Sequence, residues 1–203
     1  MKSNTTIAAA TLAISTLAGT TLANSVFNGG FETGDFSGWE TLGTGDSFFE
    51  VVSDSNTGSW AAHFRNDADA SAALIKQTGI GAGSIEAGAM VHVEFSGKGL
   101  AGIGGVFFAE LFSVDAGGGV TQSEILGGAP IFFSDTYQTY SFDTIAGPDV
   151  AGGLTIQFGA ITGAEPASFS EAFIDDVVVT FVPAPSSMAI LGLGGLVATR
   201  RRR

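Results

Sequence analysis

The stretch Val91-His92-Val93-Glu94-Phe95-Ser96 alternates apolar and polar side chains without a break. Successive side chains of a β-strand point to opposite faces, so this period of two predicts a strand with one buried face. The same alternation recurs in residues 139–142 and 154–159. Because residues 24–182 contain no convincing 3.6-residue period, this part of the chain is predicted to be all-β.

Two longer segments, residues 106–114 and 173–182, are apolar on both faces and are candidates for central strands. Gly- and Asp-rich turn signals separate the apolar runs, at residues 43–46, 79–83, 115–119 and 146–149. About nine to eleven short strands are expected from this spacing. The predicted architecture is a two-sheet sandwich of jelly-roll type.

The composition narrows the function classes. The 203 residues include 30 glycines and no cysteine, and the formal charge is −12. Without cysteine, a disulfide scaffold, a thiolate zinc site and a cysteine nucleophile are excluded. Nucleic acid is not an expected partner, because a strongly negative body repels phosphate.

The N-terminus has the pattern of a secretory signal. Lys2 precedes an uncharged, largely small and apolar stretch over residues 7–23, which ends with small residues where a signal peptidase cuts. A membrane anchor is the alternative, but the run is short and interrupted by Thr and Ser. Residues 1–23 are therefore predicted to be a helical signal peptide on an exported protein.

The C-terminus has a different pattern. Pro183 and Pro185 form a hinge, twelve mostly apolar residues follow at 188–199, and the chain closes on Arg200, Arg201, Arg202 and Arg203. A twelve-residue helix spans roughly 18 Å, short of a hydrocarbon core of roughly 30 Å. Residues 183–203 are therefore predicted to be a sorting tail with a short apolar helix, and residues 24–182 the folded domain. The arginines could otherwise be a solvated tail or a weak polyanion patch.

This order of hinge, apolar run and arginine cluster resembles the PEP-CTERM sorting signal, although Ala184 stands where that family's name has Glu. The resemblance implies processing by a membrane exosortase after passage through the secretion machinery. It also implies transient attachment to the inner membrane and a final place at the cell surface or in the extracellular matrix.

A second resemblance covers roughly residues 26–182. The segment Asn28-Gly29-Gly30-Phe31-Glu32, followed by Gly38-Trp39, and the later Phe173-Ile174-Asp175-Asp176-Val177 are similar to motifs of the galactose-binding-like jelly roll. Many carbohydrate-binding modules have this fold. The resemblance implies a structural Ca²⁺ where the first and last strands meet, with Glu32 and Asp175 or Asp176 as ligands.

The chemistry of these residues leaves two interpretations open. Ca²⁺ takes six to eight oxygens, and glycines allow a loop to bend around it. Alternatively, Glu32 caps backbone amides and the two aspartates lie at a strand edge. Strand alternation predicts that Asp175 and Asp176 point to opposite faces. Residues 54–58 and 66–69 are oxygen-rich but are interpreted as ordinary turns.

Aromatic residues are the candidates for glycan contact. Trp39 and Trp60, with Tyr137 and Tyr140, could stack on sugar rings, and neighbouring polar side chains could bind hydroxyl groups. In small sandwiches such tryptophans are more often part of the core.

Catalytic motifs are lacking. No third histidine or cysteine joins His63 and His92 to complete a zinc site, and no Gly-x-Ser-x-Gly elbow occurs. We therefore expect a non-catalytic protein that binds extracellular polysaccharide, with no cofactor apart from the Ca²⁺ that the resemblance implies. A small polysaccharide hydrolase or lyase, and a structural surface protein without ligand, remain alternatives.

Overall fold

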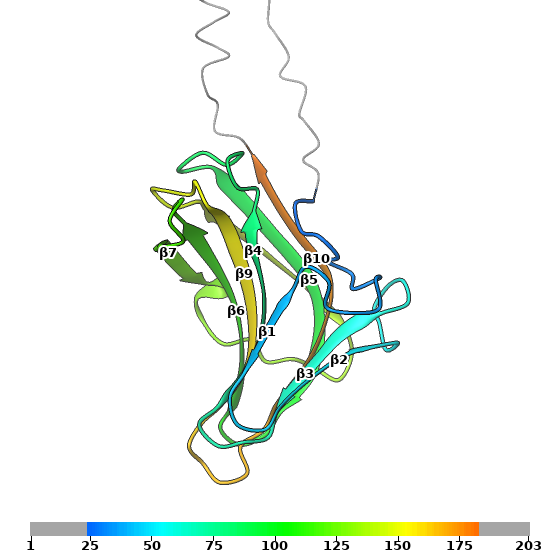
Figure 1. Cartoon of the computed structure of the whole chain (residues 1–203). Helices are drawn as coiled ribbons and strands as arrows, with labels where there is room; N and C mark the ends of the chain where they lie inside the picture. Colours follow the sequence, from blue (N-terminus) through cyan, green and yellow to red (C-terminus); the bar gives the residue numbers. More distant parts are fainter. Residues whose placement is uncertain (1–23, 183–203) are drawn as a thin grey trace, which may run out of the picture.

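The computed structural model describes residues 24–182. Within this range the chain forms ten strands in two antiparallel five-stranded sheets that face each other (Figure 1). The architecture is the predicted two-sheet jelly-roll sandwich.

The first sheet, called sheet A here, has the strand order β1-β4-β9-β6-β7. Its strands are β1 (Glu40–Gly43), β4 (Ala72–Ile80), β9 (Gly153–Thr162), β6 (Gly105–Val114) and β7 (Val120–Ile125). The predicted strand at 106–114 is β6, which lies between β9 and β7.

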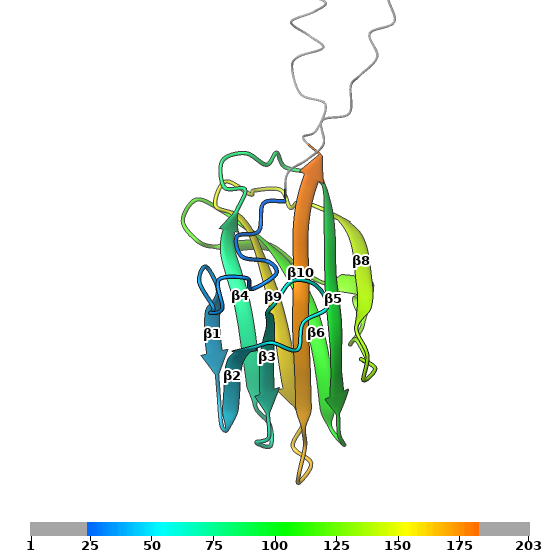
Figure 2. The same ribbon diagram turned by 90° about the vertical axis from the view of Figure 1, so that its right-hand side faces the viewer.

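The second sheet, called sheet B, has the order β2-β3-β10-β5-β8. Its strands are β2 (Ser47–Val52), β3 (Ala61–Asn66), β10 (Ser170–Val182), β5 (Met90–Ala101) and β8 (Gln138–Ile145). The predicted strand at 173–182 belongs to β10, which occupies the centre of this sheet (Figure 2).

The core forms from the inward-facing positions of both sheets. The apolar residues of two alternating stretches are buried as predicted, including Val93 and Phe95 on β5 and Ile156 and Phe158 on β9. Tyr140 and Phe142 on β8 are half-buried and pack against this core. Phe158 lies at the middle of an aromatic cluster, with ring-centroid distances of 4.9 Å to Phe95, 6.1 Å to Trp39 and 6.2 Å to Phe107. Large buried rings of this kind dominate the energetics of such a core.

Helical structure in the described part is limited to one 3₁₀ turn, Leu126–Gly128. The predicted signal helix and C-terminal apolar helix fall in residues 1–23 and 183–203, outside the described residues. Within residues 24–182 we found no helix long and apolar enough to cross a membrane.

The irregular segment before β1 runs beside β10. Ser25 N donates to Val179 O at 3.0 Å, and Val177 N donates to Gly29 O at 2.9 Å. The beginning and the end of the domain are thus joined, and residues near Glu32 come close to residues of β10.

Candidate functional site

The segment between β2 and β3, residues 53–60, lies across β10 on the outer side of sheet B (Figure 2). Two adjacent carboxylates of β10 hold it there. Asp175 Oδ2 accepts hydrogen bonds from Asn56 N at 2.8 Å and Thr57 N at 3.0 Å. The Asp176 carboxylate accepts from Asn56 Nδ2 at 2.8 Å and from the Thr57 hydroxyl.

The predicted opposite orientation of Asp175 and Asp176 is therefore wrong. The pairing of β10 with β5 shifts register between Asp175 and Val178, and Asp176 has a φ of 53°. A bulge of this kind adds a residue and resets the alternation of side chains. Both carboxylates consequently contact the same segment. Burial raises the pKa of Asp175, and the amide donors partly offset that effect.

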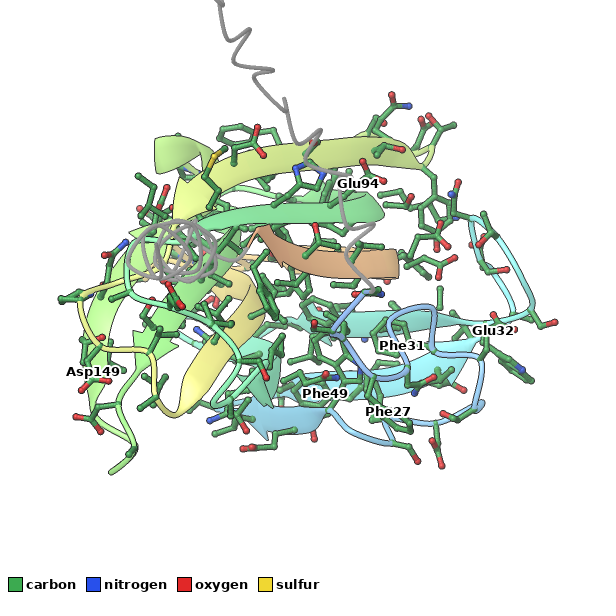
Figure 3. The ribbon with its side chains drawn as sticks, turned by 90° about the horizontal axis from the view of Figure 1, so that it is seen from above. Phe27, Phe31, Glu32, Phe49, Glu94 and Asp149 are labelled. Atoms are coloured by element: carbon green, nitrogen blue, oxygen red, sulfur yellow. The ribbon has the colours of Figure 1, made fainter. Side chains whose placement is uncertain are left out.

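Glu32 holds the other end of the same segment. Its Oε1 accepts from Ser59 N at 2.8 Å and from Trp60 N at 3.0 Å. In Figure 3, Phe31 lies toward the interior, whereas Glu32 points toward this loop. The structure thus gathers all three predicted metal-ligating residues around residues 56–60.

The carboxylates at this junction bind backbone amides. The oxygens of Glu32 and Asp175 that face the segment accept backbone N–H groups, and within residues 24–182 no group of three acidic or histidine side chains is arranged to hold a metal. These donors match the amide-capping alternative for Glu32. Bound Ca²⁺ stays a prediction, and no step below depends on it.

The two tryptophans lie in different environments. Trp39 is 6% exposed, contacts Phe31 at 5.2 Å between ring centroids, and donates from Nε1 to Asn28 O at 3.1 Å. Its ring is part of the core and cannot stack on a sugar. Trp60 is 36% exposed and packs against Gly34, which leaves part of its ring open to solvent.

The two tyrosines are not free platforms either. Tyr140 stacks on the buried ring of Phe95, with 5.4 Å between centroids. Tyr137 donates its hydroxyl to Asp54 O at 2.6 Å. Burial, with a further contribution from the charge of Asp175, raises the Tyr137 pKa well above its ordinary value.

A stacked ladder of side chains crosses the outer face of sheet B. His63 stacks on Phe173 with 4.2 Å between centroids and an interplanar angle of 3°. Lys98 Nζ lies 4.9 Å from the Phe173 centroid and 4.8 Å from that of Tyr137. His63 Nε2 is 2.7 Å from Glu171 Oε1. His63 and Lys98 flank the ring of Phe173, so this ladder braces the sheet. Beside it lies a pocket of about 200 Å³, lined by Lys98, Glu171 and Phe173, which is smaller than the groove on the other sheet.

The outer face of sheet A carries a groove of about 520 Å³. Its floor comes from three adjacent strands: β4 contributes Lys76, β6 contributes Phe112, and β9 contributes Thr155 and Gln157. The loop that follows β6, beginning at Asp115, forms one wall. The groove therefore combines an aromatic ring with polar groups, the usual makeup of a small-ligand or saccharide site.

The strand register fixes the polar row of the groove. Gln157 is opposite Lys76 on one side and Glu110 on the other. Gln157 Nε2 donates to Glu110 Oε2 at 2.8 Å, and Lys76 Nζ lies 3.3 Å from Glu40 Oε2. The row Glu40–Lys76–Gln157–Glu110 thus crosses the sheet as a chain of paired polar groups.

The sequence prediction missed these groove residues. Alternation puts Gln157 on the outer face of its strand, but Phe112 lies in a segment that is apolar on both faces, and neither pattern discloses that this face is hollow. The hollow depends on which strands are neighbours and on where the loop after β6 lies. The sorting residues Pro183, Pro185 and Arg200–Arg203 lie outside the described residues.

Comparison with known proteins supports the fold. No protein-family model matches the chain, and a search of curated proteins gave no match. Among solved structures, the carbohydrate-binding module TmCBM61 in complex with β-1,4-galactotriose has a TM-score of 0.52 and 23% identity. The alignment covers 79% of this chain and 99% of that module.

Two other similar structures are a xylan-binding domain and part of a longer tailspike chain. The CBM22-1 xylan-binding domain of Paenibacillus barcinonensis Xyn10C has a TM-score of 0.53 and 14% identity, over 76% of this chain and 92% of that one. The enzymatically active domain of tailspike protein 4 from bacteriophage CBA120 has a TM-score of 0.61 and 20% identity, over 78% of this chain. This chain spans 21% of the tailspike chain. At these identities the likeness shows the fold, which is that of carbohydrate-binding modules.

Proposed function

We propose that the protein is an exported, non-catalytic glycan-binding protein of the cell surface or extracellular matrix. The observation that carries this proposal is the groove on sheet A. A half-buried aromatic ring, Phe112, lies there beside Thr155 and Gln157, on a scaffold shared with carbohydrate-binding modules.

The groove has the groups that a sugar needs. The apolar C–H face of a pyranose can pack on Phe112, while Gln157 and Thr155 exchange hydrogen bonds with hydroxyl groups. Gln157 is held by Glu110, so its amide is ordered before a ligand arrives. A preordered polar group lowers the entropic cost of binding.

The proposal predicts binding to polysaccharide that depends on the groove. We expect the full chain to be retarded in affinity gels that contain β-1,4-galactan or xylan, with binding about tenfold weaker after Phe112→Ala or Gln157→Ala. Phe132→Ala is the control, because Phe132 is 74% exposed and does not line the groove.

Three results would argue against this function or its assignment to the groove. If the groove variants bind polysaccharide as tightly as the wild type, the groove is not the binding site. If only Trp60→Ala loses binding, the site lies at residues 53–60. Release of reducing sugar from the same polymers would contradict a non-catalytic role.

Export and sorting form the second part of the proposal. The pattern of residues 1–23 supports a cleaved signal peptide, and the order of features in residues 183–203 supports recognition by an exosortase-like enzyme at the inner membrane. Mass spectrometry of the protein from its native cells should find new termini near residue 24 and within the tail. Intact Met1 and Arg203 on cytoplasmic protein would contradict this part alone.

A further inference from the structure

Carboxylates dominate the charge around the sheet A groove. Asp115 lines it, Glu110 bonds Gln157 of its floor, and Glu40 lies beside Lys76. The whole domain is acidic as well, since residues 24–182 hold all twenty acidic residues and only three of the lysines and arginines, a net charge of −17.

The groove has one cation, and a carboxylate already neutralises it. Arg65 and Lys98 belong to sheet B, so Lys76 is the lysine or arginine of sheet A within the described residues. Lys76 Nζ lies 3.3 Å from Glu40 Oε2, and the Lys76 side chain is 26% exposed. An anionic ligand would have to compete with Glu40 for this ammonium group.

Carboxylate and amide oxygens add acceptors to the groove. Gln157 Nε2 donates one of its two N–H groups to Glu110, and Oε1 stays an acceptor. Asp115 Oδ1 takes the N–H groups of Gly117 and Gly119, both at 2.8 Å, and its second oxygen can still accept. An acceptor-rich groove favours a ligand that brings hydroxyl donors.

We infer that this groove selects neutral, hydroxyl-rich glycans and rejects anionic ones such as uronate or sulfated chains. The inference rests on the proposed function of the same groove. A carboxylate or sulfate on the ligand would lie against Asp115 and close to Glu110, which bonds the floor residue Gln157. Within the described residues the one lysine of the groove, Lys76, is already paired with Glu40, and like charges in contact across an interface are strongly unfavourable.

The test compares each neutral polymer with its charged derivative. β-1,4-galactan and xylan, and carboxymethylated preparations of both, are placed in affinity gels with the full chain at low ionic strength, where charge effects are largest. We expect binding to the carboxymethylated polymers to be at least about tenfold weaker than to the neutral ones. Added salt should narrow this difference.

A charge variant separates repulsion from a steric effect of the carboxymethyl groups. The double variant Glu110→Gln with Asp115→Asn removes two charges at nearly constant shape, and should recover binding to the charged polymers. Asp69→Asn with Glu86→Gln is the matched control, because both residues are exposed and do not line the groove. The control should leave the selectivity unchanged.

The outcomes distinguish the two claims. Equal or tighter binding of the carboxymethylated polymers would overturn the selectivity and leave glycan binding intact. Weak binding that the charge variant does not restore would also overturn it, because the cause would then be steric. Failure to bind any of the four polymers would overturn the proposed function, and the selectivity with it.

Discussion

Gly58 lets the segment between β2 and β3 lie close to the Glu32 carboxylate that holds it. Its φ is +63°, in the region that favours glycine, and a Cβ atom added there would collide with the Glu32 carboxylate. That carboxylate must lie close, because it accepts the amides of the next two residues, Ser59 and Trp60.

Gly58→Ala should therefore destabilise the protein more than the same substitution at a glycine that has a similar backbone conformation but free space around it. Gly83 is the matched control, with a φ of +71° and nothing within 4 Å of an added Cβ atom. Urea unfolding should give a loss of about 1 kcal/mol for Gly83→Ala from backbone strain, and about 3 kcal/mol for Gly58→Ala.

Equal losses at the two glycines would contradict the proposed contact with Glu32. A double-mutant cycle with Glu32→Ala adds a second readout, since removing the carboxylate should relieve the collision and give a non-additive result.

At the scale of single residues, sequence patterns predict only part of the candidate site. The motif around Glu32, Asp175 and Asp176 indicated correctly that distant residues meet, because the start of the domain pairs with β10. The direction of the two aspartates could not be predicted, because it depends on a bulge that only the pairing of β10 with β5 reveals.

At the scale of elements, local sequence patterns predict the strands. The ladder on sheet B depends instead on which strands pair. Alternation predicted strands at β5, β8 and β9, and the apolar runs predicted β6 and β10. The stacking of His63 on Phe173 was not foreseen, because the two residues are 110 positions apart and meet only through the register of β3 with β10.

The ladder should contribute to stability without contributing to glycan binding. Phe173→Ala removes the ring that lies between His63 and Lys98, and should lower the free energy of unfolding by about 2 kcal/mol. Affinity gels should show unchanged binding, since Phe173 belongs to the opposite sheet from the groove.

Leu100→Ala serves as the comparison, because Leu100 lies on the neighbouring strand β5 and is 64% exposed. Its substitution should change stability by less than about 0.5 kcal/mol. A stable Phe173→Ala variant that no longer binds polysaccharide would place a ligand site on sheet B and weaken the assignment to sheet A.

At the scale of the whole molecule, the outer faces of the two sheets carry different features. Sheet B carries the anchored segment and the ladder, both of which satisfy their own polar and aromatic groups. Sheet A carries the groove that we propose as the glycan site, lined by Phe112 and Gln157 among others. The sequence indicated a sandwich that resembles carbohydrate-binding modules. The candidate sugar contacts predicted from it, Trp39 and Trp60, do not line this groove.

The central claim is that a glycan binds on sheet A, and side-chain NMR during titration with the polysaccharide fragment that binds best tests it most directly. Two N–H signals act as reporters: the side-chain amide of Gln157 in the groove and the indole N–H of Trp60 on the other sheet. The account predicts that the Gln157 amide shifts with saturation while the Trp60 signal stays in place. A saturable shift at Trp60 with an unmoved Gln157 signal would contradict it.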